Sequence, residues 1–595
     1  MEDSVVVRFR KNAEKQDGRP AAYKLVGGAW RPYSWRQYWD GSRGFAGALI
    51  GLGHEPGQAV TIVGNNCPEW VMADVGAMIA RGVPAGIYQT SEPHQVAYVT
   101  NHCEAIVCVV ENPTIWKERV EPVLDDLKTV KKFVVIDGAD QIDHDDVISF
   151  DDFVASGADH LDAADERIAE TKADDLATLI YTSGTTGPPK GVMLTHGSLA
   201  FTSAEAIKLI GGMTPSDCNV SYLPLSHIAE QMFTIHIPLS AGSPVYYCDD
   251  LKNIKEALVA ARPTIFLGVP RVWEKFKVAL EARLGEASGI KAAIVNWSRG
   301  VGVKKGYEML EKGGDGGFSY SMADKLFFSK IKTALGLDRL RVAVVGAAPV
   351  GLDVLEFFLS IGVPIHEVYG QSEDCGPTTF NRPSPGYTKL GTAGRPFPNI
   401  EVKIADDGEI LVKGPNVFSG YYKNEAATAE TLIDGWLYSG DIGEFDEDGF
   451  LRITDRKKDL IITAGGKNVA PQNIEKLLRK IDGISQAVVI GDRRKFLSAL
   501  VTIDPERGPA LAAEKGWPTD LAALATHDAF HAHVEAGVEK ANGELARYES
   551  IKKFTIIPVD FTIEGGELTP TQKVKRRIVN EKYEAEIEAF YAGLK

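Results

Sequence analysis

The sequence lacks long apolar runs, has few cysteines and carries no excess of positive charge. The two longest apolar windows are interrupted, one by Asp74 and Arg81 and the other by Asp353 and Glu356, so neither is predicted to span a membrane. The six cysteines show no metal-ligand spacing and no disulfide framework, which indicates a reducing compartment such as the cytoplasm. The net charge of −16 argues against a nucleic-acid partner. The N-terminus shows no cationic stretch leading into an apolar one, so we expect no signal peptide.

The size and patterning of the chain predict a multidomain α/β protein. Its 595 residues are too many for one core, so two or more domains are expected. Short β-prone runs at 59–63 and 105–110 alternate with apolar helical patterns, which predicts βαβ units and a mainly parallel sheet. Residues 138–175 are rich in aspartate and alanine, and a solvated connector is favoured there over a carboxylate site.

A helical insertion is predicted in the middle of the chain. Pro270 opens a helix after a short strand at 264–267, and residues 285–335 continue as helices with a glycine-rich break at 313–317. The insertion carries Lys304 and Lys305, so a membrane surface or a sister subunit could contact it. A simple elaboration of the scaffold is the favoured interpretation.

Residues 181–196, which read YTSGTTGPPKGVMLTH, follow an apolar, β-prone run at 176–181. Such a loop can place backbone N–H groups and hydroxyls around a polyphosphate, with Lys190 countering its charge. It is not a Walker A loop, because Pro189 precedes the lysine and Gly191 follows it. An ordinary glycine-rich turn would explain the Gly-Thr-Thr-Gly alone, but not all sixteen residues.

Several further segments carry chemistry-bearing side chains but are weak signals separately. They are 65–70, 221–227, 346–349, 369–373, 438–441 and 569–576. Taken alone, His227 would be a structural histidine, Glu373 a surface carboxylate, Asp441 a turn cap and Lys573 part of a solvated basic face. Their order and spacing along the chain give them weight together.

In that order and spacing, the segments resemble the adenylate-forming superfamily of acyl-CoA synthetases, luciferases and peptide-synthetase adenylation domains. Within it, the chain is most similar to long-chain or very-long-chain fatty acyl-CoA synthetases. The residues that carry this likeness are 222–227, 262–264, 269–275, 455–459, 463–468 and 568–571. The stretch 463–466 resembles the bubblegum-type and bacterial long-chain branches, and the insertion at 285–335 is usual in long-chain members.

The resemblance implies an α/β fold with two hinged domains. A large N-terminal adenylation domain, with βαβ-type sheets and a small β-rich subdomain, is expected over 1–454. Residues 455–459 are the expected hinge, with Lys458 as its pivot, and 460–595 are the expected mobile α+β domain. The change of sequence character after 454 supports this boundary, because βα patterns and a charged C-terminal helix follow it.

The implied activity is that of a long-chain fatty acid–CoA ligase using ATP, coenzyme A and Mg²⁺. The fatty acid attacks the α-phosphorus of ATP, pyrophosphate leaves, and coenzyme A then displaces AMP. Two anions must meet in the first step, so positioning and electrostatic screening are the main needs. Magnesium is the natural clamp for the phosphates.

The resemblance also implies the ATP-binding residues. Those expected around the β- and γ-phosphates are Thr182, Ser183, Gly184, Thr185, Thr186, Gly187 and Lys190. Those expected around adenine, ribose and the α-phosphate are Gly346, Ala347, Ala348, Glu367, Tyr369, Gly370, Ser372, Asp441 and Arg456. Ser372 stands where most members have threonine and keeps the hydroxyl, whereas Glu367 stands where many have asparagine.

The remaining roles fall on a few residues of the same motifs. Glu373, with Thr182 as a second ligand, is expected to bind Mg²⁺. Lys573 is expected to bridge the carboxylate and the α-phosphate, although composition alone leaves Lys575, Arg576 and Arg577 as rivals. His227 is expected to gate access to the carboxylate. The expected coenzyme A residues are Gly465, Gly466 and Lys467, and the acyl-pocket residues Tyr222, Gly268, Val269 and Gln371, with Ile228, Gln231 and Met232 as further candidates.

Other functions remain open from the sequence. One is an adenylate-forming ligase for another carboxylic acid or for a carrier protein, and a luciferase-like oxidase belongs to the same group. Another is a catalytically silent nucleotide- or acyl-binding regulator, which predicts loss of Glu373, Asp441 or Lys573. All three positions are filled, which favours the enzyme.

Overall fold

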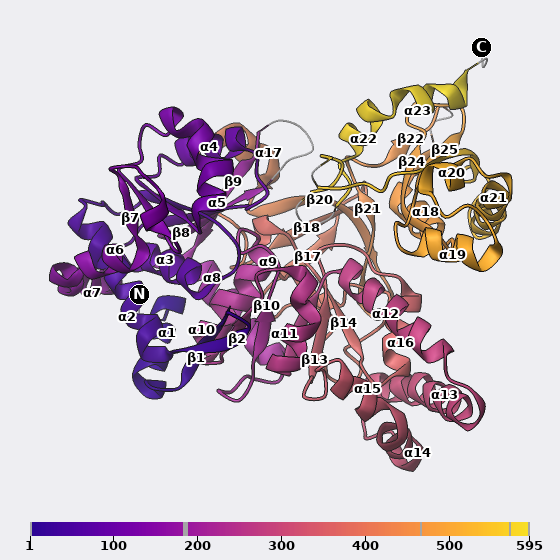
Figure 1. Ribbon diagram of the computed structural model, residues 1–595, viewed down its shortest axis with the longest axis horizontal. Helices are drawn as coiled ribbons and strands as arrows, with labels where there is room; N and C mark the ends of the chain where they lie inside the picture. Colours follow the sequence, from indigo (N-terminus) through magenta and orange to yellow (C-terminus); the bar gives the residue numbers. More distant parts are fainter. Residues whose placement is uncertain (1–2, 183–187, 465–466, 564, 570–572, 593–595) are drawn as a thin grey trace. The chain divides into compact units, whose positions relative to one another are not determined.

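The computed structural model describes residues 3–182, 188–464, 467–563, 565–569 and 573–592. It divides into two compact units (Figure 1). The larger contains residues 1–403, 411–438 and 446–451, and the smaller contains 404–410, 439–445 and 452–595. The predicted hinge at 455–459 stays a prediction.

A seven-stranded sheet forms the first part of the larger unit, in the order β7-β6-β5-β3-β4-β8-β9. Its strands are β3 (Ala59–Val63), β4 (Val83–Ile87), β5 (Val107–Val110), β6 (Lys132–Val135), β7 (Val147–Ser149), β8 (Leu176–Thr182) and β9 (Lys190–Thr195). All neighbours are parallel except β8 and β9. The predicted strands at 59–63 and 176–181 are therefore confirmed, and their largely apolar runs suit strands buried on both faces.

Helices accompany this sheet. They are α1 (Val5–Gln16), α2 (Trp35–Gly51), α3 (Pro68–Ile79), α4 (Pro93–His102), α5 (Pro113–Ile115), α6 (Phe150–Ser156), α7 (Leu161–Glu170) and α8 (His196–Leu209). The acidic segment 138–175 is more than the expected solvated connector, because Phe150 and Phe153 are buried. A Cβ on Gly47 of α2 would lie 2.4 Å from the carbonyl oxygen of Gly157. The composition of this segment gave no indication that Gly157 packs closely against α2.

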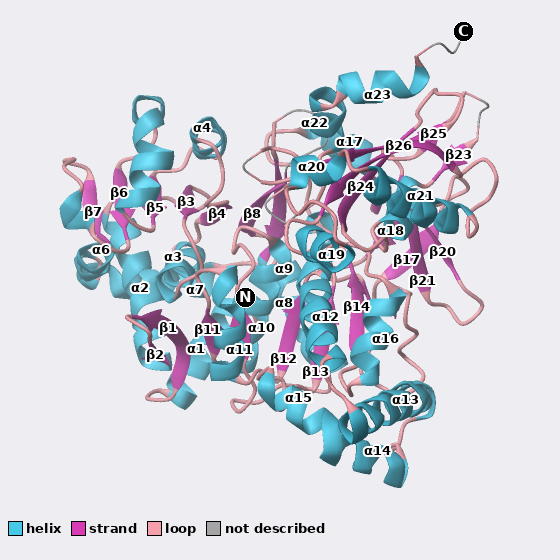
Figure 2. Cartoon of the chain, turned by 45° about the vertical axis from the view of Figure 1, so that its right-hand side comes forward, coloured by secondary structure: helices cyan, strands magenta, loops and turns pink. Residues whose placement is uncertain are grey.

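Two further sheets complete the α/β part of the larger unit. The first has the order β10-β11-β1-β2, with β1 (Pro20–Val26), β2 (Ala29–Ser34), β10 (Asn219–Ser221) and β11 (Val245–Tyr247). The second has the order β12-β13-β14-β15-β16, with β12 (Ile265–Gly268), β13 (Val342–Val345), β14 (Ile365–Tyr369), β15 (Thr379–Phe380) and β16 (Arg395–Pro396). Strands β12, β13 and β14 are parallel, as βα units require (Figure 2).

The helices of this second half include a long insertion. They are α9 (Ile228–Gln231), the π-turn η5 (Met232–His236), α10 (Ile237–Ala241), α11 (Ile254–Ala261), α12 (Pro270–Gly285), α13 (Gly289–Lys312), α14 (Gly317–Ala323), the π-turn η7 (Asp324–Phe328), α15 (Ser329–Ala334) and α16 (Leu352–Ser360). Helix α12 begins at Pro270, as predicted, with Trp273 fully buried. Residues 285–335 contain α13, α14, η7 and α15.

The rest of the chain forms smaller sheets. Strands β17 (Glu401–Ile404), β18 (Glu409–Lys413), β20 (Trp436–Phe445) and β19 (Leu432–Ile433) follow in that order, with β21 (Leu451–Arg456) beside β20 and α17 (Glu425–Thr431) before β19. The smaller unit contains β22 (Ile461–Ile462), β23 (Asn468–Val469), β24 (Ile484–Ile490), β25 (Leu497–Ile503) and β26 (Ile551–Ile557). Its helices are α18 (Pro471–Leu478), α19 (Arg507–Lys515), α20 (Leu521–Ala525), α21 (Asp528–Asn542), α22 (Arg576–Lys582) and α23 (Glu584–Tyr591).

Two sequence-level expectations about the whole chain can be compared with the structure. All six cysteines lie in the described residues, buried and without a disulfide partner. Among the described residues, every helix is too short or too polar to cross a bilayer.

Candidate active site

The ends of the predicted phosphate loop lie side by side in a hairpin. Thr182, the last residue of β8, pairs with Lys190, the first residue of β9. The Lys190 ammonium lies 4.6 Å from the centre of the Tyr421 ring, and the Tyr421 hydroxyl donates to Oε1 of Glu373 at 2.8 Å. Predicted loop residues Ser183, Gly184, Thr185, Thr186 and Gly187 lie outside the described residues.

The segment around Tyr421 ties Glu373 to strand β9. The backbone N–H of Met193 donates to Gly420, and that of Tyr422 donates to Gly191. At the other end of the segment, the N–H of Phe418 donates to the carbonyl of Glu373 at 2.8 Å. The structure therefore brings Thr182, Lys190 and Glu373 together through a segment that the sequence analysis did not single out.

The motif at 369–373 is held by its own tight backbone. A Cβ on Gly370 would lie 1.5 Å from the carbonyl oxygen of Gly376, so no larger residue fits there. Asp374 is fully buried, and its carboxylate accepts from the N–H of Gln371 at 2.6 Å and from the hydroxyl of Thr378 at 2.7 Å. Asp374 thus fixes the loop that carries Ser372 and Glu373, and sequence reasoning missed it.

The predicted adenine residues lie at the ends of β13 and β14. Gly346, Ala347 and Ala348 follow β13, and Tyr369 ends β14. Ala347 has a φ of 69°, a left-handed conformation that is strained for alanine and is found most often at functional sites. Oε2 of Glu367 accepts from the N–H of Gly391 at 2.8 Å, so this carboxylate also braces the neighbouring loop.

Two buried polar side chains hold the loop that leads to His227. Asn66 donates to Ser221 Oγ at 2.8 Å and to the carbonyl of Leu223 at 2.7 Å. Glu230 accepts from the N–H of Tyr222 at 3.2 Å and from the Thr234 hydroxyl at 2.6 Å. Asn66 lies in a segment that the sequence analysis singled out without a role, whereas Glu230 was missed altogether.

His227 caps helix α9 with its ring. Its Nδ1 accepts from the N–H of Ala229 at 3.2 Å, which assigns the neutral ring's proton to Nε2. Burial raises the pKa of Glu230 to about 7 against the opposing hydrogen bonds of Thr234, Ser221 and the backbone N–H groups. A carboxyl poised near neutrality therefore lies three residues from the predicted gate.

The four predicted acyl-pocket residues are dispersed around this loop. The Tyr222 hydroxyl donates to the carbonyl of Leu267 at 3.0 Å, which places it beside Gly268 and Val269. A Cβ on Gly268 would lie 2.4 Å from the indole nitrogen of Trp273. The amide nitrogen of Gln371 is buried and has no hydrogen-bond partner among the described residues.

An apolar cavity of about 40 Å³ lies nearby. It is lined by Ala206, Ile210, Met213, Asn219, Met232, Phe233, Ile237, Ile265, Val344, Val368, Pro377, Phe380 and Phe397. Met232 also lies against the turn that follows the 369–373 motif, because a Cβ on Gly376 would meet its Cγ at 3.4 Å. Ligand pockets usually measure roughly 300–1,000 Å³, so this cavity must widen to admit a long chain. Met232 is the one acyl candidate of the sequence analysis that lines it.

Within the smaller unit, the two predicted ribose residues form an ion pair. Nε of Arg456 lies 3.2 Å from Oδ1 of Asp441, whose side chain is buried. Lys457 pairs with Asp407 and Glu409, each at 2.7 Å. Lys458 lies exposed in the turn after β21, a position compatible with a pivot.

The predicted catalytic lysine also lies in the smaller unit. The carbonyl of Lys573 accepts from the N–H of Thr569 at 2.8 Å, and the N–H of Lys573 donates to Thr569 Oγ1 at 3.0 Å. Among its compositional rivals, Arg576 is bound by both oxygens of Glu475 at 2.6 Å, and Arg577 pairs with Glu581. Arg576 and Arg577 thus have structural partners, and the catalytic role of Lys573 stays a prediction.

Only one of the three predicted coenzyme A residues can be described. The Lys467 ammonium lies 6.0 Å from the ring centre of Tyr548. Gly465 and Gly466 lie outside the described residues.

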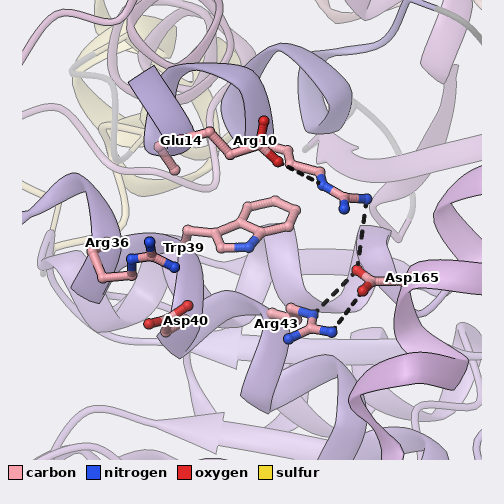
Figure 3. Close-up of a pocket in the computed structure, with 8 residues that line it drawn as sticks. Arg10, Glu14, Arg36, Trp39, Asp40, Arg43 and Asp165 are labelled. Carbon is pink, nitrogen blue, oxygen red and sulfur yellow. Dashed lines mark hydrogen bonds and ion pairs between the residues drawn. The ribbon is translucent and has the colours of Figure 1, made fainter. Parts of the chain in front are cut away.

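A second cavity, of about 200 Å³, has a different character (Figure 3). It is lined by Arg10, Ala13, Glu14, Arg36, Trp39, Asp40, Arg43 and Asp165. Arg10 pairs with Glu14 at 3.1 Å, and Arg43 pairs with Asp165 at 2.6 Å. Because these charges largely compensate one another and no predicted site residue lines it, we do not assign the cavity to the reaction.

The oxygen ligands near the phosphate loop fit a magnesium ion. Glu373 supplies a carboxylate and Thr182 a hydroxyl, and both are the hard donors that Mg²⁺ prefers. Among the described residues there is no group of three or more His, Cys, Asp or Glu side chains that could hold a metal. Mg²⁺ commonly binds through one or two carboxylates together with substrate phosphates, so this donor set suits it.

Comparison with known proteins assigns the chain to a class. The AMP-binding enzyme family matches residues 9–422, and the AMP-binding enzyme C-terminal domain matches residues 458–595. The chain therefore belongs to the AMP-binding enzyme family, which confirms its resemblance to adenylate-forming enzymes.

Full-length relatives are more specific. Long-chain-fatty-acid–CoA ligase ACSBG2 of Xenopus laevis is 37% identical, over 98% of this chain and 83% of its own length. Long-chain-fatty-acid–CoA ligase FadD15 of Mycobacterium tuberculosis is 37% identical, over 96% of this chain and 94% of its own length. The human ACSBG2 is 34% identical over 98% of this chain.

Solved structures confirm the predicted α/β fold. The anthranilate CoA ligase AuaEII in complex with anthranoyl-AMP matches with a TM-score of 0.72 at 19% identity, covering 97% of both chains. The A domain of a carboxylic acid reductase from Segniliparus rugosus matches with a TM-score of 0.74 at 20% identity, covering 100% of this chain and 95% of that one. At these identities the likeness concerns the fold alone.

Proposed function

We propose that this chain is an AMP-forming long-chain fatty acid–CoA ligase. The observation that carries the proposal is the cluster of Lys190, Tyr421 and Glu373 beside the phosphate loop. It occurs in a chain whose relatives, at 34–37% identity over nearly all of its length, are named long-chain-fatty-acid–CoA ligases. The overall reaction converts a fatty acid, ATP and coenzyme A into acyl-CoA, AMP and pyrophosphate.

Adenylation requires that two anions approach each other. Lys190 and the loop beside Thr182 bind the β- and γ-phosphates and retain pyrophosphate as it leaves. Ser372 donates to the α-phosphate, and Lys573 donates to both the carboxylate and the α-phosphate in the transition state. Mg²⁺, when bound by Glu373 and Thr182, neutralises phosphate charge. Preorganised donors of this kind act most strongly where water is excluded.

Nucleotide recognition falls to residues at strand ends and in the smaller unit. Gly346, Ala347, Ala348 and Tyr369 enclose the adenine, and Asp441 accepts hydrogen bonds from the ribose hydroxyls. The ion pair between Asp441 and Arg456 orients this carboxylate. The smaller unit then turns about Lys458, which exchanges Lys573 for Lys467 when coenzyme A attacks.

The acyl chain enters beside His227 and continues into the apolar cavity next to Met232. Methionine suits such a place, because its unbranched side chain adapts to different shapes. Tyr222, Gly268, Val269 and Gln371 surround the carboxylate end. Buried, unpaired thiols at all six cysteines support a reducing, cytoplasmic setting.

A two-product assay tests this function. The purified chain is incubated with ATP, Mg²⁺ and coenzyme A together with saturated acids from octanoate to tetracosanoate, and AMP and acyl-CoA are measured in each mixture. Equal amounts of AMP and acyl-CoA are expected, with the highest kcat/KM for long-chain acids. A carrier protein replaces coenzyme A in a parallel series. Turnover confined to octanoate and decanoate, or to the carrier protein, would exclude the proposed activity.

A further inference from the structure

The helical insertion carries an unusual share of the exposed apolar surface. Among the described residues, fifteen large hydrophobic side chains are exposed, and six of them lie between positions 290 and 326. They are Ile290, Trp297, Tyr307, Phe318, Met322 and Leu326. This stretch is about one-sixteenth of the chain, so chance would place about one there. Exposed apolar side chains gathered in this way mark an interaction surface.

Helix α13 is packed with its small residues inward. Its buried residues are Ser298, Gly302 and Gly306, spaced by four and therefore on one face. A Cβ on Gly302 would lie 2.4 Å from the carbonyl oxygen of Ser360 on α16, and a Cβ on Gly306 would meet Leu359 at 2.6 Å. At these two positions the inner face thus has no room for large side chains, while Val295 and Val301 pack partly buried beside them.

The outer face of α13 has the opposite composition. Ile290, Trp297 and Lys304 recur every seven residues, and all three are exposed. Ile290 is 81% exposed, although burial of such a side chain in an ordinary helix would be favourable. A simple scaffold helix would carry its large apolar residues on the packed face. Large apolar side chains left on the outer face, as Ile290 and Trp297 are, are what a docking surface requires.

The next helical stretch repeats the arrangement. Along α14 and η7, Phe318, Met322 and Leu326 are exposed at intervals of four, and Phe318 is 80% exposed. Ala323 and Phe327, which directly follow Met322 and Leu326, are buried. Helices α13 and α14 are in contact and lie together at the lower right of the ribbon (Figure 1). Two neighbouring helices therefore each expose an apolar stripe.

Positive charge accompanies these stripes. Residues 285–335 contain eight basic and five acidic side chains, a net charge of +3 in a chain with a net charge of −16. Lys291, Lys304, Lys325 and Lys330 are exposed, and none forms an ion pair with any described residue. Apolar side chains among unpaired lysines match an anionic lipid bilayer, in which negatively charged headgroups cover an apolar interior.

We propose that the outer stripes of α13 and of α14–η7, with their lysines, form a docking surface for an anionic lipid membrane. The interaction is peripheral. Ile290, Trp297, Phe318, Met322 and Leu326 enter the interface between headgroups and acyl chains, and the lysines bind the anionic headgroups. A second copy of this chain is the competing occupant, and it is the poorer match because a symmetric contact would bring the lysines of two such surfaces against each other.

Vesicle binding tests the proposal independently of catalysis. The full-length protein is sedimented with vesicles of phosphatidylcholine alone and with vesicles containing one quarter phosphatidylglycerol. We expect binding to the anionic vesicles, weakened by salt, and little binding to the neutral ones. Replacing Ile290 and Trp297 by glutamine, or Phe318 and Met322 by glutamine, should each weaken binding roughly tenfold or more.

Replacing a lysine of this surface by glutamine should weaken binding about fivefold, since one lysine near an anionic membrane contributes about 1 kcal/mol. The matched controls, Val259→Ser on α11 and Val559→Ser in the smaller unit, remove exposed valines elsewhere and should bind as the unaltered protein does. All these positions lie outside the proposed reaction site, so turnover of detergent-dispersed fatty acid should be unchanged.

Several results would overturn the docking surface. They are absence of binding to anionic vesicles, equal binding to neutral ones, or undiminished binding of both apolar double variants. Sedimentation equilibrium tests whether a second copy of this chain occupies the surface instead. A dimer that the apolar variants dissociate, without vesicle binding, would assign the surface to self-association instead. Vesicle binding without acyl-CoA formation would refute the proposed enzyme activity and leave the surface intact.

Discussion

Replacing Glu230 by glutamine is expected to remove a pH-dependent destabilisation of the fold. Burial raises the pKa of this carboxyl from 4.5 to about 7. Between these two pH values the folded state holds one more proton than the unfolded state, so stability falls as pH rises. One pKa unit corresponds to about 1.4 kcal/mol, which gives about 3 kcal/mol across the window. Glutamine does not titrate and should not contribute this slope.

Thr234→Val provides a matched variant with the opposite effect on the titration. The Thr234 hydroxyl donates to Glu230 at 2.6 Å, and a hydrogen bond to a charged group contributes about 1.5–3 kcal/mol. Its loss should raise the pKa of Glu230 by a further one to two units or so. Tyr222 and Tyr247 also bear on this carboxyl, but burial raises the pKa of both far above neutrality, so they stay uncharged.

This effect is measured by the thermal unfolding midpoint of the larger unit, recorded at several pH values between pH 5 and pH 8. The unaltered protein should lose stability over this range more steeply than Glu230→Gln, and Thr234→Val should extend its loss to higher pH. The KM for fatty acid should rise in Glu230→Gln while the KM for ATP stays unchanged, because Glu230 holds the loop beside Tyr222. Parallel pH profiles for the unaltered protein and Glu230→Gln would refute the assignment.

Three further predictions concern other parts of the molecule. Lys573→Ala should reduce pyrophosphate release by about 100-fold or more yet still form acyl-CoA from synthetic acyl-adenylate, and equal loss of both half-reactions would contradict its role. Burial raises the pKa of Asp74 to about 8, and neither of its carboxylate oxygens has a hydrogen-bond partner among the described residues. The unfolding free energy of Asp74→Asn relative to the unaltered protein should therefore rise by about 1.4 kcal/mol per pH unit from pH 4 to 8. This gain should appear in urea titrations, and a pH-independent difference would argue against it. Ala206→Phe should narrow the apolar cavity and lower kcat/KM for hexadecanoate more than for octanoate. Phe233→Ala should raise kcat/KM for longer acids relative to shorter ones. If neither variant changes the ratio of kcat/KM for hexadecanoate to that for octanoate, the acyl chain does not enter this cavity.

The parts of the fold that follow local rules could be predicted from the sequence. The strand at 59–63 is a β-prone run that is apolar except for Thr61, and the helix beginning at Pro270 has a proline at its first position and apolar residues at helical spacing. The acidic segment was misjudged because its packing depends on Gly47 meeting Gly157, a contact between residues 110 positions apart. Composition carries no information about such a contact.

The candidate site likewise contains residues that a sequence motif identifies and residues that only the structure reveals. Residues with their own motif, such as Glu373 and Lys190, could be named in advance. Tyr421, Asp374 and Glu230 could not, because each acts by hydrogen-bonding a motif residue and such partners have no sequence pattern of their own. The apolar cavity was equally hidden, since its lining comes from many separate elements.

The bonds between residues 418–422 and β9 also bear on how the chain matures. Strand β9 is the last strand of the seven-stranded sheet, and its outer edge is satisfied by a segment more than 220 residues further along the sequence. During synthesis this edge therefore stays open until residue 422 has left the ribosome. An open edge invites pairing with other chains, so fragments ending before residue 418 should aggregate, whereas longer ones should close the edge themselves.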